Sequence, residues 1–185
     1  MIYFMRHGED LPEYVGGWSD APLTEEGIKE VEEVAKWIKD NLNIKRIITS
    51  DVDRAQETAE VVNKYLNVDI KVTRVLREQD KGELTGKLRE RLTPYEKSLL
   101  DFQEIDTLFP NGETLVDLYN RMKNNFEYFK NIPDDTLLIT HRAVINMFYY
   151  ITRNMELDMN KKQFGATFAS VHEFDKEKNT IRKIR

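Results

Sequence analysis

The chain contains 185 residues, carries a formal net charge of -5 and has no cysteine. This length corresponds to about one domain with a core of its own. The lack of cysteine excludes disulfides and thiolate nucleophiles and favours a cytoplasmic protein. The acidic charge argues against a nucleic-acid partner, and no apolar run approaches the roughly 20 residues of a membrane span. We therefore expect neither nucleic acid nor a membrane as a partner.

Apolar strands and amphipathic helices alternate along the chain. Short continuous apolar runs are typical of strands buried on both faces, and the segments between them carry apolar residues at helical spacing. Thr24 is expected to cap the first helix, and Ser50 or Asp51 the second. The predicted strands cover residues 2–5, 46–49, 69–72 and 136–140, and a late hairpin covers 168–174 and 180–184. Two further helices are expected over 112–130 and after His141.

This alternation predicts the fold class. It indicates an α/β protein, a three-layer α/β/α sandwich with a mainly parallel central sheet and helices on both faces. Residues 81–110 are too long and too charged for an ordinary connection. We expect them to form a helical cap or lid insertion within a single domain that covers residues 1–185.

Basic side chains follow three of the predicted strands. Arg6 and His7 end the first strand, Arg54 lies in the first turn of the helix after the second, and His141 and Arg142 follow the strand TLLIT. The carboxyl ends of parallel strands meet at one edge of a sheet. Guanidinium and imidazole groups clustered there repel one another unless an anion lies among them, and phosphate suits both groups. The sequence therefore predicts a phosphate site at this edge.

Six motifs, three of which contain these residues, occur in a fixed order. They are RHGE at 6–9, GGWSDAPLTEEG at 16–27, SDVDRAQETAEVV at 50–62, LREQDKGELTG at 76–86, PNGET at 110–114 and LLITHRAV at 137–144. This ordered set resembles the histidine phosphatase superfamily, also called the phosphoglycerate mutase-like family, over nearly the whole chain. No cofactor is expected, and no spacing of histidines and carboxylates resembles a metal-ligand set.

The resemblance implies a role for each matching residue. It implies that His7 attacks phosphorus and becomes a phosphohistidine, which is nucleophilic catalysis. Arg6, Arg54 and His141 are implied to hold the phosphoryl oxygens together with His7. Gly8 is expected to let the backbone pass close to the phosphate and to contribute to substrate binding.

Four positions leave alternatives open. Glu78 matches the family's acidic position, which protonates the leaving oxygen and then activates water, although Asp80 is close enough to replace it. Trp18 either packs its loop against the body or contacts substrate. Arg142 occupies a position where the family usually has glycine, and its side chain either points outward or contacts an acidic or multiply phosphorylated substrate. Glu13 stands where the family often has a phosphate-binding asparagine, so either its side chain turns away or the loop has a different register.

The other charged residues are assigned structural or surface roles. Glu113 is expected to cap its helix, with support of the active-site residues as the less favoured alternative, and His172 is expected to be structural. Lys87, Arg89 and Arg91 in the insertion are expected to form a solvated face.

These observations favour one function over two others. We expect a metal-independent phosphomonoester hydrolase that acts on a small phosphorylated metabolite and also binds inorganic phosphate. Phosphoglycerate mutase is the first alternative, although the 81–110 insertion is shorter than that branch normally carries. The second is a phosphate-binding or phosphopeptide-binding module without turnover. The oligomeric state stays open.

Overall fold

A computed structural model describes residues 1–185 and contains one six-stranded sheet in the order β3-β2-β4-β1-β5-β6. The strands β3, β2, β4 and β1 run parallel, whereas β5 and β6 are antiparallel to their neighbours. The expected fold class, an α/β/α sandwich with a mainly parallel sheet, is confirmed. The strands are β1 (Ile2–Arg6), β2 (Arg46–Ser50), β3 (Asp69–Thr73), β4 (Thr136–Thr140), β5 (Val171–Asp175) and β6 (Thr180–Lys183).

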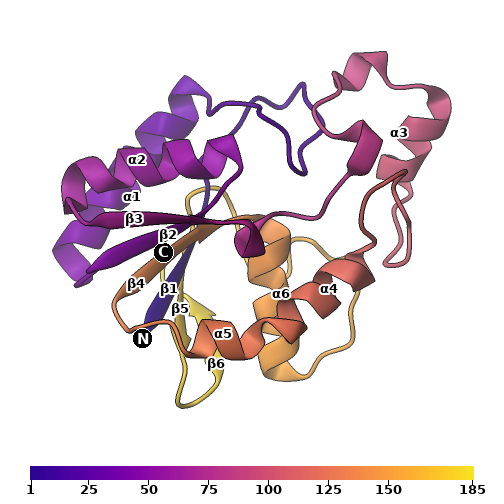
Figure 1. Ribbon diagram of the computed structural model, residues 1–185. Helices are drawn as coiled ribbons and strands as arrows, with labels where there is room; N and C mark the ends of the chain where they lie inside the picture. The colour runs from indigo at the N-terminus through magenta and orange to yellow at the C-terminus, as the bar shows by residue number, and fades with distance from the viewer.

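Helices cover both faces of the sheet (Figure 1). Side chains alternate in direction along a strand, so each buried strand supplies two cores. Met5 of β1 packs in the core beneath α1 and α2, whereas its neighbour Phe4 packs in the core that α4, α5 and α6 cover. The helices are α1 (Glu25–Asn41), α2 (Asp53–Leu66), α4 (Leu115–Asn124), α5 (Phe126–Lys130) and α6 (Arg142–Arg153). None of the helices is both long enough and apolar enough to span a membrane.

Two predicted helix starts have different outcomes. The Oγ1 atom of Thr24 accepts a hydrogen bond from the backbone N–H of Gly27, so Thr24 caps α1 as predicted. The second prediction is wrong, because α2 begins after Val52 without a side-chain cap. The side chain of Asp51 binds Arg77, and that of Ser50 contacts His141.

Two other predicted elements differ in their bounds. The single helix expected over 112–130 is two helices, because the chain leaves helical geometry at Asn125. The late hairpin begins at Val171, whereas Phe168 lies in a loop against Arg6.

The segment 81–110 carries short helices, as expected of a helical insertion. It contains η2 (Gly82–Leu84), η3 (Arg89–Arg91) and α3 (Pro94–Asp101), and the short helix η1 (Arg74–Leu76) precedes it. Its buried residues Leu84, Leu92 and Phe109 form a small core with Val15 from the loop after β1. Backbone hydrogen bonds join the same two segments. The insertion is therefore anchored to the loop that follows the first strand.

Candidate active site

The carboxyl ends of three neighbouring strands bring the predicted residues together. His7 follows β1, His141 follows β4, and β2 ends at Ser50. The two imidazole rings lie 5.1 Å apart, centroid to centroid. Arg54, in the first turn of α2, hydrogen-bonds to both rings. The expected cluster of histidines and arginines is thus present at one edge of the sheet.

The hydrogen bonds of His7 indicate which ring nitrogen is available for attack. Its Nδ1 lies 2.7 Å from the carbonyl oxygen of Gly8, and because a carbonyl only accepts, Nδ1 carries the proton. Its Nε2 accepts a hydrogen bond of 3.2 Å from the Nε of Arg54. The side chain is 3% exposed, and burial together with Arg54 and Arg6 holds its pKa well below the usual value. His7 is therefore a neutral imidazole whose Nε2 lone pair faces a cation.

Arg54 occupies the centre of the cluster and is 2% exposed. Its guanidinium donates to the carbonyl oxygen of Gly17 at 2.7 Å and to the Nδ1 of His141 at 3.2 Å. The Nε2–H of His141 then donates to the Oγ of Ser50 at 3.0 Å. Burial, followed by Arg54, lowers the pKa of His141 well below its usual value. Both rings are neutral for the same physical reasons.

Arg6 provides a second buried cation. One of its terminal nitrogens donates to the carbonyl oxygen of Ala166 at 3.1 Å, and its guanidinium lies 3.8 Å from the ring centroid of Phe168. Its Nε is buried without a partner. Burial and the nearby Arg142 lower the pKa of Arg6 to about 9. An anion in the cleft would relieve both the repulsion and the unmet donor.

Glu78 lines the same cleft from the loop after η1. One carboxylate oxygen accepts from the backbone N–H of Ala143, near the N-terminus of α6, at 3.3 Å, and the other accepts from the N–H of Gln79 at 3.0 Å. Asp80 lines neither of the two pockets at this edge of the sheet, and its carboxylate accepts from the backbone N–H of Gly82. The geometry therefore favours Glu78 over Asp80 as the proton donor.

Three side chains fix the loop that carries Glu78. The indole N–H of Trp18 donates to the carbonyl oxygen of Glu78 at 2.8 Å. Arg121 donates to the carbonyl oxygens of Arg77 and Glu78, each at 3.1 Å. The Oε1 of Glu113 accepts from the Nε of Arg121 at 2.9 Å. Glu113 therefore supports the loop of Glu78, the less favoured alternative, and the expectation that it caps its helix is wrong. The cap of α4 is Thr114, in a capping box with Asp117.

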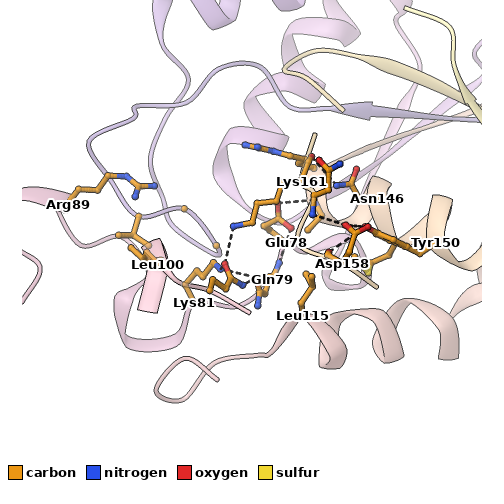
Figure 2. A pocket seen from close by; sticks show the side chains of 18 residues that line it. Glu78, Gln79, Lys81, Arg89, Leu100, Leu115, Asn146, Tyr150, Asp158 and Lys161 are labelled. Carbon is orange, nitrogen blue, oxygen red and sulfur yellow. Dashed lines mark hydrogen bonds between the residues drawn. The ribbon is translucent and has the colours of Figure 1, made fainter. Parts of the chain in front are cut away.

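Two adjoining pockets open at this edge, with volumes of about 260 and 310 Å³. The smaller contains His7, Arg6 and Arg54, and the larger extends toward α6 and the insertion. Figure 2 shows the larger pocket, with Arg89 and Leu100 of the insertion on one side and residues of α6 on the other. Both pockets share Gly16, Gly17, Glu78, Arg89 and Arg142.

Four expectations about substrate contacts have separate outcomes. Arg142 lines both pockets, which favours the contacting alternative over the outward one. Trp18 lines neither pocket. Glu13 also lines neither pocket and is exposed, as expected of a side chain that turns away. Gly8 also lines neither, and a Cβ at this position would lie 2.6 Å from a methyl group of Val31. The lack of a side chain at Gly8 is therefore required for packing against α1.

Two residues of the cleft were missed by the sequence analysis. The carboxylate of Asp10 lies 3.5 Å from the Nε of Arg54, and burial raises its pKa even though Arg54 acts in the opposite direction. Its place three residues after His7 in RHGED was the only signal. Arg89 is exposed, as expected of a solvated face, and it also lines both pockets, which the sequence analysis did not predict. Nothing in the basic run of the insertion distinguishes it from its neighbours.

The sheet and the arginine-clamped histidines place the protein in a class of α/β enzymes that transfer phosphoryl groups. The chain belongs to the histidine phosphatase superfamily, branch 1, whose family model matches residues 2–185. The expected family is thereby confirmed.

Relatives and solved structures agree with this placement. The Proteus mirabilis protein named Probable phosphoglycerate mutase GpmB is 33% identical over 149 residues, which are 76% of this chain and 68% of that protein. Bacillus stearothermophilus YhfR superposes with a TM-score of 0.80 at 24% identity, over 99% of this chain and 94% of that one. A mycobacterial glucosyl-3-phosphoglycerate phosphatase superposes with a TM-score of 0.72 at 20% identity, over 98% and 94%. These two structures support the fold.

Proposed function

We propose that the protein hydrolyses small phosphate monoesters through a phosphohistidine formed on the Nε2 of His7. The observation that carries this proposal is the neutral His7 ring, with Nδ1–H bound to a carbonyl and the Nε2 lone pair directed at Arg54. The Nε2 of this neutral imidazole is unprotonated, and its lone pair can attack phosphorus once the N–H of Arg54 turns to the phosphate dianion, which the cationic cleft attracts.

The first chemical step transfers the phosphoryl group to the protein. The Nε2 lone pair of His7 attacks phosphorus, and the ester P–O bond breaks. The leaving oxygen takes the proton of Glu78, whose carboxyl group lines the same cleft. Arg6 and Arg54 stabilise the charge on the three phosphoryl oxygens.

The second step returns the enzyme to its starting state. The carboxylate of Glu78 removes a proton from water, the oxygen attacks phosphorus, and the N–P bond breaks to release inorganic phosphate and neutral His7. His141 can assist because its Nε2 contacts a hydroxyl, which donates as well as it accepts. His141 would present Nδ1–H to a phosphoryl oxygen once the Ser50 hydroxyl donates to Nε2 and the guanidinium of Arg54 turns from Nδ1 to the phosphate.

The test is hydrolysis of p-nitrophenyl phosphate in excess EDTA by the wild type and by His7→Ala. We expect turnover in the wild type and a loss of roughly 10³-fold or more in the variant, because the nucleophile is removed. His172→Gln is the matched control, since His172 lies outside both pockets and bonds only to Tyr149 and Ser170. Circular dichroism shows whether each variant folds. Turnover that survives in His7→Ala would contradict the mechanism, and an inactive wild type would favour a binding module.

Phosphoglycerate mutase is the second candidate, supported by the name of the Proteus mirabilis relative. A mutase must retain its bisphosphorylated intermediate, which favours an extensive enclosing insertion. The insertion here contributes one α-helix of eight residues, α3, and this favours hydrolysis. Interconversion of 2- and 3-phosphoglycerate that depends on a bisphosphate primer and exceeds phosphate release would establish the mutase instead.

A further inference from the structure

The carboxylate of Asp10 lies in the phosphate cleft and has no role in the two chemical steps. Asp10 lines the smaller pocket together with Arg6 and Arg54. It does not line the larger pocket, whose charged lining includes Lys81 and Lys161. A carboxylate in the smaller pocket opposes a phosphate dianion, because like charges repel. Its charge therefore works against the ligand that the arginines attract.

The loop that carries Asp10 is fixed to α2. Asp10 pairs with Leu23 in an isolated antiparallel bridge, and backbone hydrogen bonds flank the pair on both sides. The N–H of Leu23 donates to the Oε2 of Glu57 at 2.8 Å, and Glu57 lies on α2, about one turn after Arg54. The position of Asp10 beside Arg54 is therefore set by the backbone as well as by the two charges.

Asp10 and His7 meet the same nitrogen of Arg54. The Oδ2 of Asp10 lies 3.5 Å from the Nε of Arg54, and the Nε2 of His7 accepts from that nitrogen at 3.2 Å. The terminal nitrogens of Arg54 already donate to the carbonyl oxygens of Gly17 and Ser19. The Nε–H is therefore the donor that a phosphoryl oxygen would take over, and Asp10 competes for it.

The ion pair of Asp10 is loose. Arg54 is its only cation within salt-bridge distance, at 3.5 Å, whereas Asp51 accepts two hydrogen bonds of 2.6 Å from Arg77. The Arg77 guanidinium holds the pKa of Asp51 below its usual value, but burial raises the pKa of Asp10 despite Arg54. A carboxylate in this position is easily protonated when a second anion arrives.

Charges on several elements act on Asp10. Arg54 of α2 and Arg6 of β1 lower its pKa, and Glu78 of the loop after η1 raises it. The other charged or titratable residues that line this cleft are His7, Glu9, Tyr14, Arg89 and Arg142. A bound phosphate dianion adds negative charge and engages the arginines. Both changes favour a protonated Asp10, whose O–H can donate to a phosphoryl oxygen.

We propose that Asp10 competes with phosphate for Arg54, and that phosphate binding draws a proton from solvent onto the Asp10 carboxylate. In the empty cleft the carboxylate is the counterion of Arg54. In the complex the protonated carboxyl donates to a phosphoryl oxygen, and the Nε–H of Arg54 turns to the phosphate. After hydrolysis, loss of this proton to solvent restores the ion pair and expels inorganic phosphate. The proposal rests on the proposed function in placing phosphate in this cleft.

Sulfate is the probe, because it is a tetrahedral dianion of constant charge near neutral pH. Isothermal titration calorimetry at pH 7.5 gives its Kd for the wild type, Asp10→Asn and Asp10→Ser. We expect both variants to bind about tenfold more tightly, the factor that corresponds to about one pKa unit of repulsion. Asp20→Asn is the control and should keep Kd within about twofold. Asp20 is an exposed acid of the same loop and lines neither pocket.

Proton uptake identifies the group that titrates. Titrations in two buffers with different enthalpies of ionisation give the number of protons bound together with sulfate. Near pH 6 we expect the wild type to bind up to about one proton more than Asp10→Asn. An anion also favours protonation of His7, His141 and Glu78, so the difference between the two proteins reports Asp10. By linkage, the sulfate affinity of the wild type should rise more steeply as the pH falls.

The outcomes separate this proposal from the proposed function. Sulfate affinity that is unchanged or weaker in both Asp10 variants, or no sulfate binding at all, would overturn the proposal. Equal proton uptake in the wild type and Asp10→Asn would overturn it as well. His7-dependent hydrolysis of p-nitrophenyl phosphate would stand in each case. A wild type that hydrolyses nothing would contradict the proposed function, and the sulfate titrations would still decide the role of Asp10. Circular dichroism verifies that each variant is folded.

Discussion

The Nε of Arg54 lies 3.2 Å from the Nε2 of His7 and donates a hydrogen bond to its lone pair. The same guanidinium donates to His141, so one buried cation orients both rings. It also lowers the pKa of both rings, because a positive charge beside an imidazole disfavours the imidazolium. Under the proposed mechanism, Arg54 therefore prepares the nucleophile as well as binding phosphate.

The first prediction concerns Arg54→Met. We expect kcat/KM for p-nitrophenyl phosphate to fall by roughly 10²-fold to 10³-fold, as when one electrostatic donor is removed from an active site. The pKa of His7 should rise, because one of the groups that lower it is gone. His7 attacks only when neutral, so the acidic limb of the pH profile should move to higher pH. Steady-state rates measured from pH 4 to pH 8 check both effects.

A surface arginine provides the control for this experiment. Arg74 is largely exposed and lines neither pocket. Its Nε lies 3.5 Å from the Oδ2 of Asp51, which precedes α2. Arg74→Met should retain kcat/KM within about twofold, because exposed ion pairs contribute little. An unchanged acidic limb in Arg54→Met would show that Arg54 does not control the pKa of His7.

The second prediction separates Glu78 from Asp80. Glu78→Gln should lower kcat for an alkyl phosphate by about 10²-fold to 10⁴-fold, the usual contribution of a general acid. The loss should be smaller for p-nitrophenyl phosphate, whose leaving group needs little protonation. Asp80→Asn retains an oxygen to accept from Gly82 and should keep both rates. Equal losses for both substrates in Glu78→Gln, or a loss only in Asp80→Asn, would contradict the assignment.

Features determined by local sequence were predicted well. Thr24 caps α1 because its partner is the N–H three residues later, and such a short-range contact is visible in the sequence. The buried strands were found from their continuous apolar runs. The edges of the late hairpin were not, because Phe168 is apolar but packs on Arg6 instead of joining β5.

Features determined by distant partners were not predictable from one sequence. Ser50 looked like a helix cap, but its hydroxyl contacts His141, which is 91 residues away. Glu113 looked like a cap as well, yet it pairs with Arg121, whose other partners lie in residues 75–78. Lys161 belongs to no motif and reaches its pocket only because the chain folds back after α6. These contacts depend on tertiary packing, which periodicity does not encode.

The third prediction tests Arg121 as a positioning residue. Arg121→Met removes donors from three carbonyl oxygens, those of Val75, Arg77 and Glu78, and deprives the carboxylate of Glu113 of its cation. We expect the free energy of unfolding to fall by about 1–3 kcal/mol. We also expect kcat to fall while KM changes little, because the loop of Glu78 moves but the arginines of the phosphate cleft do not.

Two further variants sharpen this test. Arg121→Lys should recover part of the stability and part of kcat, since an ammonium group can still donate to a carbonyl oxygen. Lys123→Met on the same helix is exposed and should change neither quantity. Loss of stability in Arg121→Met with kcat intact would indicate a purely structural role.

The fourth prediction follows from the pKa values of the histidines. Burial lowers the pKa of His172 to about 4, and those of His7 and His141 lie well below the usual value near 6.5. Between pH 6.5 and pH 5 the unfolded chain therefore binds protons that the folded protein does not. The free energy of unfolding should fall as the pH falls through this range, by up to about 1.4 kcal/mol per pH unit for each histidine.

Urea denaturation in phosphate-free buffers at intervals from pH 7 to pH 5 measures this slope. The range lies above the usual pKa values of carboxyl groups, so the histidines dominate it. His172→Gln removes one of the three groups, and its slope should be smaller by up to about 1.4 kcal/mol per pH unit below pH 6. A flat stability curve over this range would mean that the folded protein protonates its histidines as readily as the unfolded chain, and that His7 is not held neutral.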